Sequence, residues 1–211
     1  MPVISWLTLK AKCRYCHKPI SAQYPIIEVL NAGIWLLSFI VLKPTSPLEY
    51  IMLIVWLLAS SCLLALAVYD AKWLELPDGL VLFFAVSTLA YISVKVISSG
   101  SFGIISSSLL GVLAIAGLFY GLYVFSNGAW IGGGDVKLAV GMGILLGIEA
   151  GLLAIFIAAL AGSIFGIGGI AFFGKKRSAQ IPFGPFLIMA TIVSFLFGGI
   201  LIDWYMNLII L

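Results

Sequence analysis

Long uninterrupted runs of apolar residues dominate this sequence, and apolar and polar positions do not alternate within them. A membrane-spanning helix needs about 20 largely apolar residues, whereas the strands of a membrane β-barrel alternate over about 10 residues. The runs therefore predict an all-α fold, a polytopic transmembrane helical bundle, and they argue against a barrel. We expect about seven membrane segments, at residues 25–42, 50–69, 79–97, 102–125, 136–148, 151–173 and 183–211.

The fifth run, 136–148, is too short to cross a bilayer alone. We expect it to cross by borrowing flanking residues, or to lie inside the bundle. Composition agrees with a membrane protein, because charged residues make up 9% of the chain and apolar residues 63%, against about 25% charged residues in soluble domains. The predicted organisation is a basic segment at 1–24 followed by one bundle at 25–211.

The basic residues lie in short connecting segments, and the net charge is only +3. Because Lys and Arg concentrate in cytoplasmic loops, we interpret them as orientation signals and not as a nucleic-acid surface. A cytoplasmic N-terminus leaves only Lys43 and Lys95 outside, which predicts a multi-pass protein of the inner membrane. The cytoplasmic set is then Lys10, Lys12, Arg14, Lys18, Lys72, Lys137, Lys175, Lys176 and Arg177.

Two aspartates stand at the ends of apolar runs, where an ionised group is poorly solvated. Asp70 closes the second run, and Asp135 follows three glycines at the start of the fifth. The predicted topology returns both to one membrane face. Two close carboxylates share a proton, so that one can activate water while the other donates to the substrate oxygen. This pairing predicts hydrolysis of a peptide bond without a covalent intermediate.

The glycines before Asp135 have no Cβ atoms, so Gly132 to Gly134 can take conformations closed to other residues and let a substrate backbone approach. We include Gly132 and Gly134 among the candidate site residues. A phosphate-binding loop would end in Gly-Lys-Ser/Thr, and that ending is missing here. Simpler interpretations remain open, in which Asp70 is a solvated residue at a helix end and Asp135 is an N-cap.

Three charged residues lie close to the two aspartates in the sequence. Asp78 follows Pro77 and is interpreted mainly as a helix cap, with support of Asp70 as the alternative. Lys72 and Lys137 each lie two residues beyond an aspartate. They are interpreted as lysines that extend to the membrane surface, though either could hold substrate or tune the aspartate pair.

Cys13 and Cys16 form a Cys-x-x-Cys pair in the basic segment, with His17 adjacent. The pair would be half of a tetrahedral zinc site, which needs four ligands, and a second chain could donate the others. In a cytoplasmic segment the thiols would otherwise stay reduced.

Four stretches, in order and spacing, resemble the type IV prepilin leader peptidases, membrane aspartyl proteases with a Gly-x-Gly-Asp motif. They are residues 69–78 (Tyr-Asp-Ala-Lys-Trp-Leu-Glu-Leu-Pro-Asp), 132–138 (Gly-Gly-Gly-Asp-Val-Lys-Leu), 181–186 (Ile-Pro-Phe-Gly-Pro-Phe) and the region 13–28. Members of the family usually begin with a further membrane helix and a first Cys-x-x-Cys pair, and this chain starts after both.

The resemblance implies that Asp70 and Asp135 are the catalytic aspartates and that proteolysis needs no cofactor. It implies cleavage, at the cytoplasmic face and just after a glycine, of a short basic leader from pilin-like precursors. The precursor's apolar helix would enter the bundle from the bilayer. S-adenosylmethionine would be a cofactor only if methyl transfer to the new terminus is retained.

Two other functions compete with the peptidase. A transporter or cation channel could use buried aspartates to bind H⁺ or a cation, but such folds often pair broken helices in two matching halves. Only one broken element is visible here, and both aspartates are predicted at one face. An inactive relative acting as an assembly factor is the third hypothesis. The residues leave open which precursor is cut, whether it serves a pilus, secretion or DNA uptake, and the oligomeric state.

Overall fold

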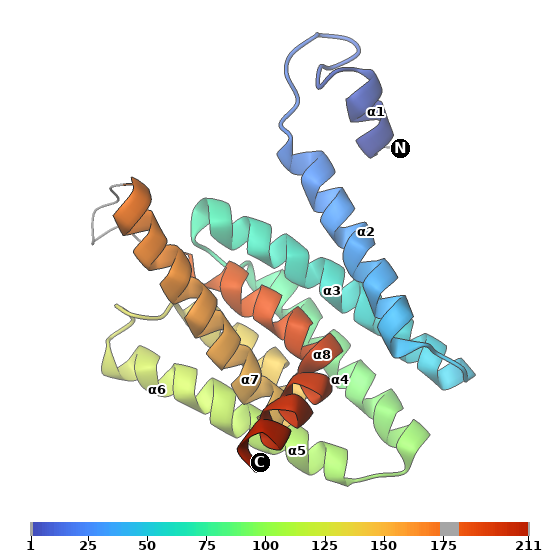
Figure 1. The fold of residues 1–211 in the computed structure, drawn as a ribbon, viewed down its shortest axis with the longest axis vertical. Coiled ribbons are helices and arrows are strands. Elements are labelled where there is room, and N and C mark those ends of the chain that lie inside the picture. The colour runs from blue at the N-terminus through green and yellow to red at the C-terminus, as the bar shows by residue number, and fades with distance from the viewer. Residues whose placement is uncertain (1, 174–181, 211) are drawn as a thin grey trace. The chain divides into compact units, whose positions relative to one another are not determined.

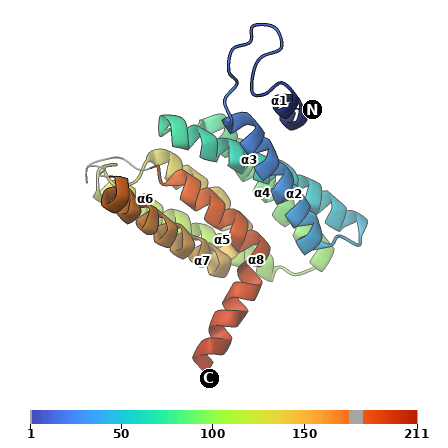
Figure 2. The same cartoon turned by 45° about the horizontal axis from the view of Figure 1, so that its top comes forward.

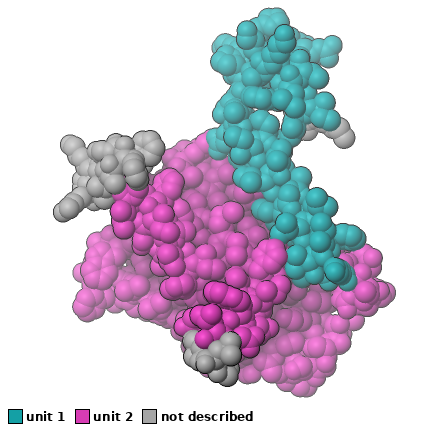
Figure 3. Space-filling model, in the orientation of Figure 1, with its two compact units in different colours: residues 1–43 teal, residues 44–211 magenta. Residues whose placement is uncertain are grey.

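The computed structural model describes residues 2–173 and 182–210, which form helices and no strand within those ranges (Figure 1). This confirms the predicted all-α class. Two compact units, 1–43 and 44–211, are coloured separately in Figure 3. The predicted division after residue 24 stays a prediction. The helices are α1 (Pro2–Thr8), α2 (Gln23–Leu42), α3 (Pro47–Trp73), α4 (Asp78–Ser99), α5 (Gly103–Gly111), η1 (Val112–Ala116), α6 (Gly117–Phe125), α7 (Gly133–Phe173) and α8 (Gly184–Ile210).

The first unit consists of α1, a tight hairpin and α2. An isolated bridge pairs Lys12 with Pro19, and the Cys13 N–H donates to the Lys18 carbonyl at 2.9 Å. The Trp6 indole N–H donates to the Ile20 carbonyl at 3.0 Å, which attaches α1 to the far side of the hairpin. The Cys-x-x-Cys pair therefore lies on a hairpin closed by backbone bonds.

Within residues 2–173 and 182–210, six helical stretches are long and apolar enough to cross a membrane, where seven segments were expected. They are α2, α3, α4, the continuous stretch Gly103–Phe125, α7 and α8. The expected fifth and sixth segments are joined in α7 without a loop, because only Gly147 inside that helix departs from helical geometry, at φ 68° and ψ −165°. The chain is thus a multi-pass membrane protein, and the side of its N-terminus stays a prediction.

The break at Gly147 turns α7 back on itself. Asp135, near its start, lines a pocket at the end of α3, and the first residue of α8 contacts that same end of α3. Phe165, on the second arm of α7, packs against Phe186 in α8 with ring centroids 5.5 Å apart. In a straight helix Asp135 and Phe165 would be about 45 Å apart. The first arm, 133–146, therefore spans about 21 Å and lies within the bundle, which was one of the two expectations for it.

Close backbone contact holds this first arm against α5. A Cβ on Gly111 would lie 2.6 Å from the Gly143 carbonyl oxygen, so the two helices touch where neither has a side chain. The Ser108 hydroxyl adds a hydrogen bond of 2.8 Å to the Ile144 carbonyl, three residues before the break. The arm that carries Asp135 is therefore fixed in place by its neighbour.

An aromatic core joins α3, α4 and α8. Trp56 is fully buried and stacks on Phe195 with ring centroids 3.8 Å apart, while Tyr91 meets Phe195 edge-on at 5.4 Å. In Figure 2 the last turns of α8 extend away from the rest of its unit. The core thus fixes α8 near its middle, with its start left beside the end of α3. Lys175, Lys176 and Arg177, used in the charge count, lie outside the described residues.

Candidate active site

Asp70 lies in the last turn of α3 and is buried, with 7% of its surface exposed. The helix ends three residues later, at Trp73, because Leu74 takes a left-handed conformation, and the Leu74 N–H donates to the Asp70 carbonyl at 2.9 Å. The chain then crosses to Asp78, where α4 begins. Burial shows that the interpretation of Asp70 as a solvated helix-end residue is wrong.

Asp135 lies in the first turn of α7, which begins at Gly133. Its backbone N–H donates to the Gly132 carbonyl at 3.1 Å. An N-cap would stand one residue before the helix, so the interpretation of Asp135 as the cap of this helix is wrong. Its carboxylate is partly exposed and belongs to the wall of a pocket.

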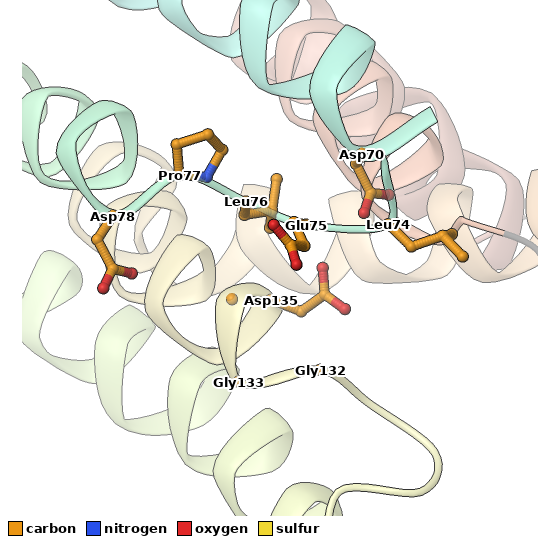
Figure 4. Close-up of a pocket in the computed structure, with 10 residues that line it drawn as sticks. Asp70, Leu74, Glu75, Leu76, Pro77, Asp78, Gly132, Gly133 and Asp135 are labelled. Carbon is orange, nitrogen blue, oxygen red and sulfur yellow. The ribbon is translucent and has the colours of Figure 1, made fainter. Parts of the chain in front are cut away.

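The two aspartates line one pocket of about 460 Å³, as the sequence topology predicted for their helix ends (Figure 4). In Figure 4 their carboxylates are directed toward one another from α3 and α7. Two carboxylates so placed can share one proton and bind a water between them. The remaining lining residues are Leu74, Glu75, Leu76, Pro77, Asp78, Gly132, Gly133 and Gly134.

The third element of the site is the start of α8. The Gly184 N–H donates to Oδ2 of Asp70 at 3.0 Å, in a buried contact. Gly184 belongs to the motif 181–186, which carries part of the family resemblance, but the sequence predicts no role for it; Ile181 lies outside the described residues. The Gly184-Pro185 pair at the start of an apolar run indicates where a helix begins. It does not predict which residue of another helix the Gly184 amide contacts.

Gly132 and Gly134 line the pocket as predicted, but the reason differs from the one expected. Among the described glycines, only Gly100, Gly128 and Gly147 have a positive φ, so Gly132 to Gly134 do not take a conformation reserved for glycine. Gly134 is instead needed for close approach, because a Cβ there would lie 2.9 Å from Cβ of Leu76. The segment between α3 and α4 thus packs directly on the glycines.

Asp78 and Lys137 form an ion pair of 2.6 Å between the starts of α4 and α7. Both side chains are well exposed. Pro77 holds the cap position of α4 and makes no side-chain cap bond, so the interpretation of Asp78 as a helix cap is wrong. Lys72 does not line the pocket, and its Nζ lies 5.4 Å from the Trp73 ring centroid.

The Cys13 and Cys16 thiols lie close together on the first unit's hairpin. Hydrogen bonds from the backbone N–H groups of Cys16 and Tyr15, and from the Cys16 side chain, lower the pKa of the Cys13 thiol. In the part of the chain that the structure describes, no three His, Cys, Asp or Glu residues are grouped to hold a metal. The pair supplies two of the four ligands of a zinc site, so the described residues do not fit a complete one.

Comparisons with known proteins identify the family to which the sequence belongs. Residues 57–167 match the model of the "Type IV leader peptidase family", and residues 1–42 match the "Bacterial Peptidase A24 N-terminal domain". No solved structure matches the chain.

Curated relatives match over nearly the whole chain. A "Prepilin leader peptidase/N-methyltransferase" of Aeromonas salmonicida is 30% identical over 214 residues, covering 100% of this chain and 70% of the relative. Proteins of the same name are 29% identical in Legionella pneumophila (98% and 70% covered) and 26% identical in Bacillus subtilis (99% and 79% covered). The chain belongs to the type IV leader peptidase family.

Proposed function

We propose that this protein is an aspartic endopeptidase that removes the leader from prepilin-like precursors, with Asp70 and Asp135 as its catalytic pair. The observation that carries the proposal is the shared pocket, in which carboxylates from α3 and α7 face one another (Figure 4). Family membership supports proteolysis as the reaction, and the relatives' names support prepilins as the substrate.

The chemistry follows from one proton shared by the two carboxylates. The ionised carboxylate takes a proton from water, whose oxygen attacks the scissile carbonyl carbon. The protonated carboxyl donates its proton to the carbonyl oxygen, which gives a gem-diol. When the C–N bond breaks, the leaving nitrogen takes the proton held by one carboxyl, and a gem-diol hydroxyl gives its proton to the other carboxylate, so the pair again holds one proton. No covalent intermediate forms.

The pocket wall favours a basic leader. Glu75 lines it beside the two aspartates and is exposed, whereas the charge of Asp78, also in the lining, is balanced by its ion pair with Lys137. Acidic side chains at a binding site attract and orient positively charged segments. Among the pocket-lining residues there is no Lys or Arg. The precursor's apolar helix would lie in the bilayer, with its leader at the cytoplasmic face of the inner membrane.

The test is cleavage of a prepilin-type precursor by purified protein, with the product identified by mass. Asp70→Asn and Asp135→Asn should each lower the rate by at least about 1,000-fold, because each removes a group that transfers a proton. Asp203→Asn, an exposed change in α8, is the matched control and should cleave normally. Full activity in either pocket variant would rule out the aspartate pair. Proton or cation flux in liposomes, lost in Asp135→Asn, would instead support the transporter alternative.

Methyl transfer, the second activity in the relatives' names, would need S-adenosylmethionine as the methyl donor. The apolar pocket between α4 and α5 has only the hydroxyls of Ser93 and Ser108 as polar side chains, and the latter already donates to Ile144. That pocket does not fit the charged amino-acid end of the cofactor, and no methyl-transfer step is assigned to its residues. The mass of the product's new N-terminus, after incubation with S-adenosylmethionine, tests this activity separately.

A further inference from the structure

Asp70 and Gly184 are 114 positions apart in the chain and meet inside the helical unit. The Gly184 N–H donates to Oδ2 of Asp70 at 3.0 Å, and both residues are buried. The first N–H groups of a helix have no partner within that helix. A carboxylate from α3 therefore satisfies a donor that belongs to α8.

The rest of this helix start explains why α8 needs an outside partner. Pro185 has no N–H, and the N–H groups of Phe186 and Leu187 both donate to the Phe183 carbonyl at 3.1 Å. Phe183, just before the helix, has no side-chain oxygen with which to cap it. The Gly184 amide is the donor that remains, and Asp70 takes the place of the missing cap.

The missing side chain of Gly184 matters as much as its amide. A Cβ at this position would lie 2.6 Å from Oδ2 of Asp70 and 2.9 Å from its Cγ. Real Cβ atoms do not approach other heavy atoms so closely, so the carboxylate occupies the space a side chain would need. Any larger residue at 184 would have to displace Asp70 or the start of α8.

Aromatic contacts fix this helix start independently of Asp70. Phe183 packs against Phe119 of α6 with ring centroids 6.3 Å apart, and Phe186 packs against Phe165 of α7 at 5.5 Å. Such pairs contribute about 0.5–1.5 kcal/mol each beyond the area they bury. Gly184 therefore lies between two anchored residues, and its N–H has a fixed direction.

We propose that Gly184 is a positioning residue for Asp70, so that the first turn of α8 sets where the carboxylate lies. This rests on the proposed function, in which Asp70 is one of the catalytic pair. An amide N–H can only donate, so Oδ2 uses one of its lone pairs to accept this bond. Oδ1 has no bond to α8, and we assign it to the water and to the proton shared with Asp135.

The first test replaces Gly184 with alanine in the full chain and measures precursor cleavage per folded enzyme. Gly184→Ala should lower kcat by about 100-fold with KM unchanged, since a misplaced catalytic group slows the chemical step. Gly199→Ala, in the same helix, is the control, because a Cβ there has nothing within 4 Å. A Gly184→Ala enzyme with wild-type kcat, or one whose loss equals its loss of folded protein, would overturn the proposal.

The second test does not depend on cleavage, and it tests the contact between Gly184 and Asp70 even if Gly184→Ala does not fold. Hydrogen exchange of the Gly184 amide is measured in wild type, Asp70→Asn, Asp70→Ala and Asp135→Ala. We expect faster exchange in Asp70→Ala only, because asparagine keeps an oxygen that can accept the bond. Equal exchange in all four proteins would overturn the proposal even if Asp70→Asn abolishes cleavage. Full cleavage by Asp70→Asn would instead refute the proposed function and leave the exchange result standing.

Discussion

Asp70 lies in the last turn of α3 and Asp135 in the first turn of α7, so the two walls of the pocket place the same side chain at opposite helix ends. A helix favours a negative charge at its N-terminus and disfavours one at its C-terminus. Asp135 gains this benefit from its own helix. Asp70 gains it only from α8, whose first N–H donates to its carboxylate.

The difference shows that the two walls depend on different parts of the fold. The position of Asp70 depends on how α8 packs against α3, which is a buried tertiary contact. The position of Asp135 depends on where α7 starts, on the backbone contact of its arm with α5 and on the exposed Asp78–Lys137 pair, and none of these contacts is made by the Asp135 carboxylate itself. We therefore expect Asp70 to be coupled to the stability of the bundle and Asp135 to be nearly independent of it.

The largest expected difference between the two aspartates is in stability, and it is measured by replacing each with alanine and following unfolding. Asp70→Ala should lower the free energy of unfolding by about 1–3 kcal/mol, because it leaves the buried Gly184 amide without a partner. Asp135→Ala should cost less than about 1 kcal/mol, the usual value of an acidic residue in a first helical turn. Thermal or denaturant unfolding in detergent measures both. Equal losses of unfolding free energy in the two variants would show that the contact with α8 does not make Asp70 more important for stability than Asp135.

A smaller effect is expected from the ion pair between α4 and α7. Lys137→Met should lower cleavage by at most about fivefold at low salt, since exposed pairs are worth about 0–1 kcal/mol and are screened. The exchanged pair, Asp78→Lys with Lys137→Asp, should recover most of the loss if the contact acts only as a brace. A loss above about 100-fold without recovery would contradict this, and would indicate that Lys137 contacts the substrate.

The apolar runs were enough to predict most of the helices, because a bilayer fixes their length and composition. They did not reveal how 136–148 joins 151–173. The expected boundary was at 149–150, whereas the break is a single residue, Gly147, with no loop. A glycine with positive φ inside an apolar run has the same appearance in a sequence as any other glycine, so only the packing against α5 reveals it.

Some features of the candidate site could likewise be predicted from the sequence and others could not. The shared pocket of Asp70 and Asp135 could be predicted because helix ends at one membrane face are brought together by topology. The contact of Gly184 with Asp70 could not, because it depends on how α8 packs against α3. Local rules also failed at Asp78, where the sequence favoured a cap and the side chain instead pairs with Lys137.

The most direct measurement is the rate of precursor cleavage by Asp70→Asn, Asp135→Asn and the double variant. If the two carboxylates act as one proton-sharing unit, the double variant should be no slower than either single variant, because the first substitution already removes the unit. Losses that multiply in the double variant would show two independent contributions and contradict the account.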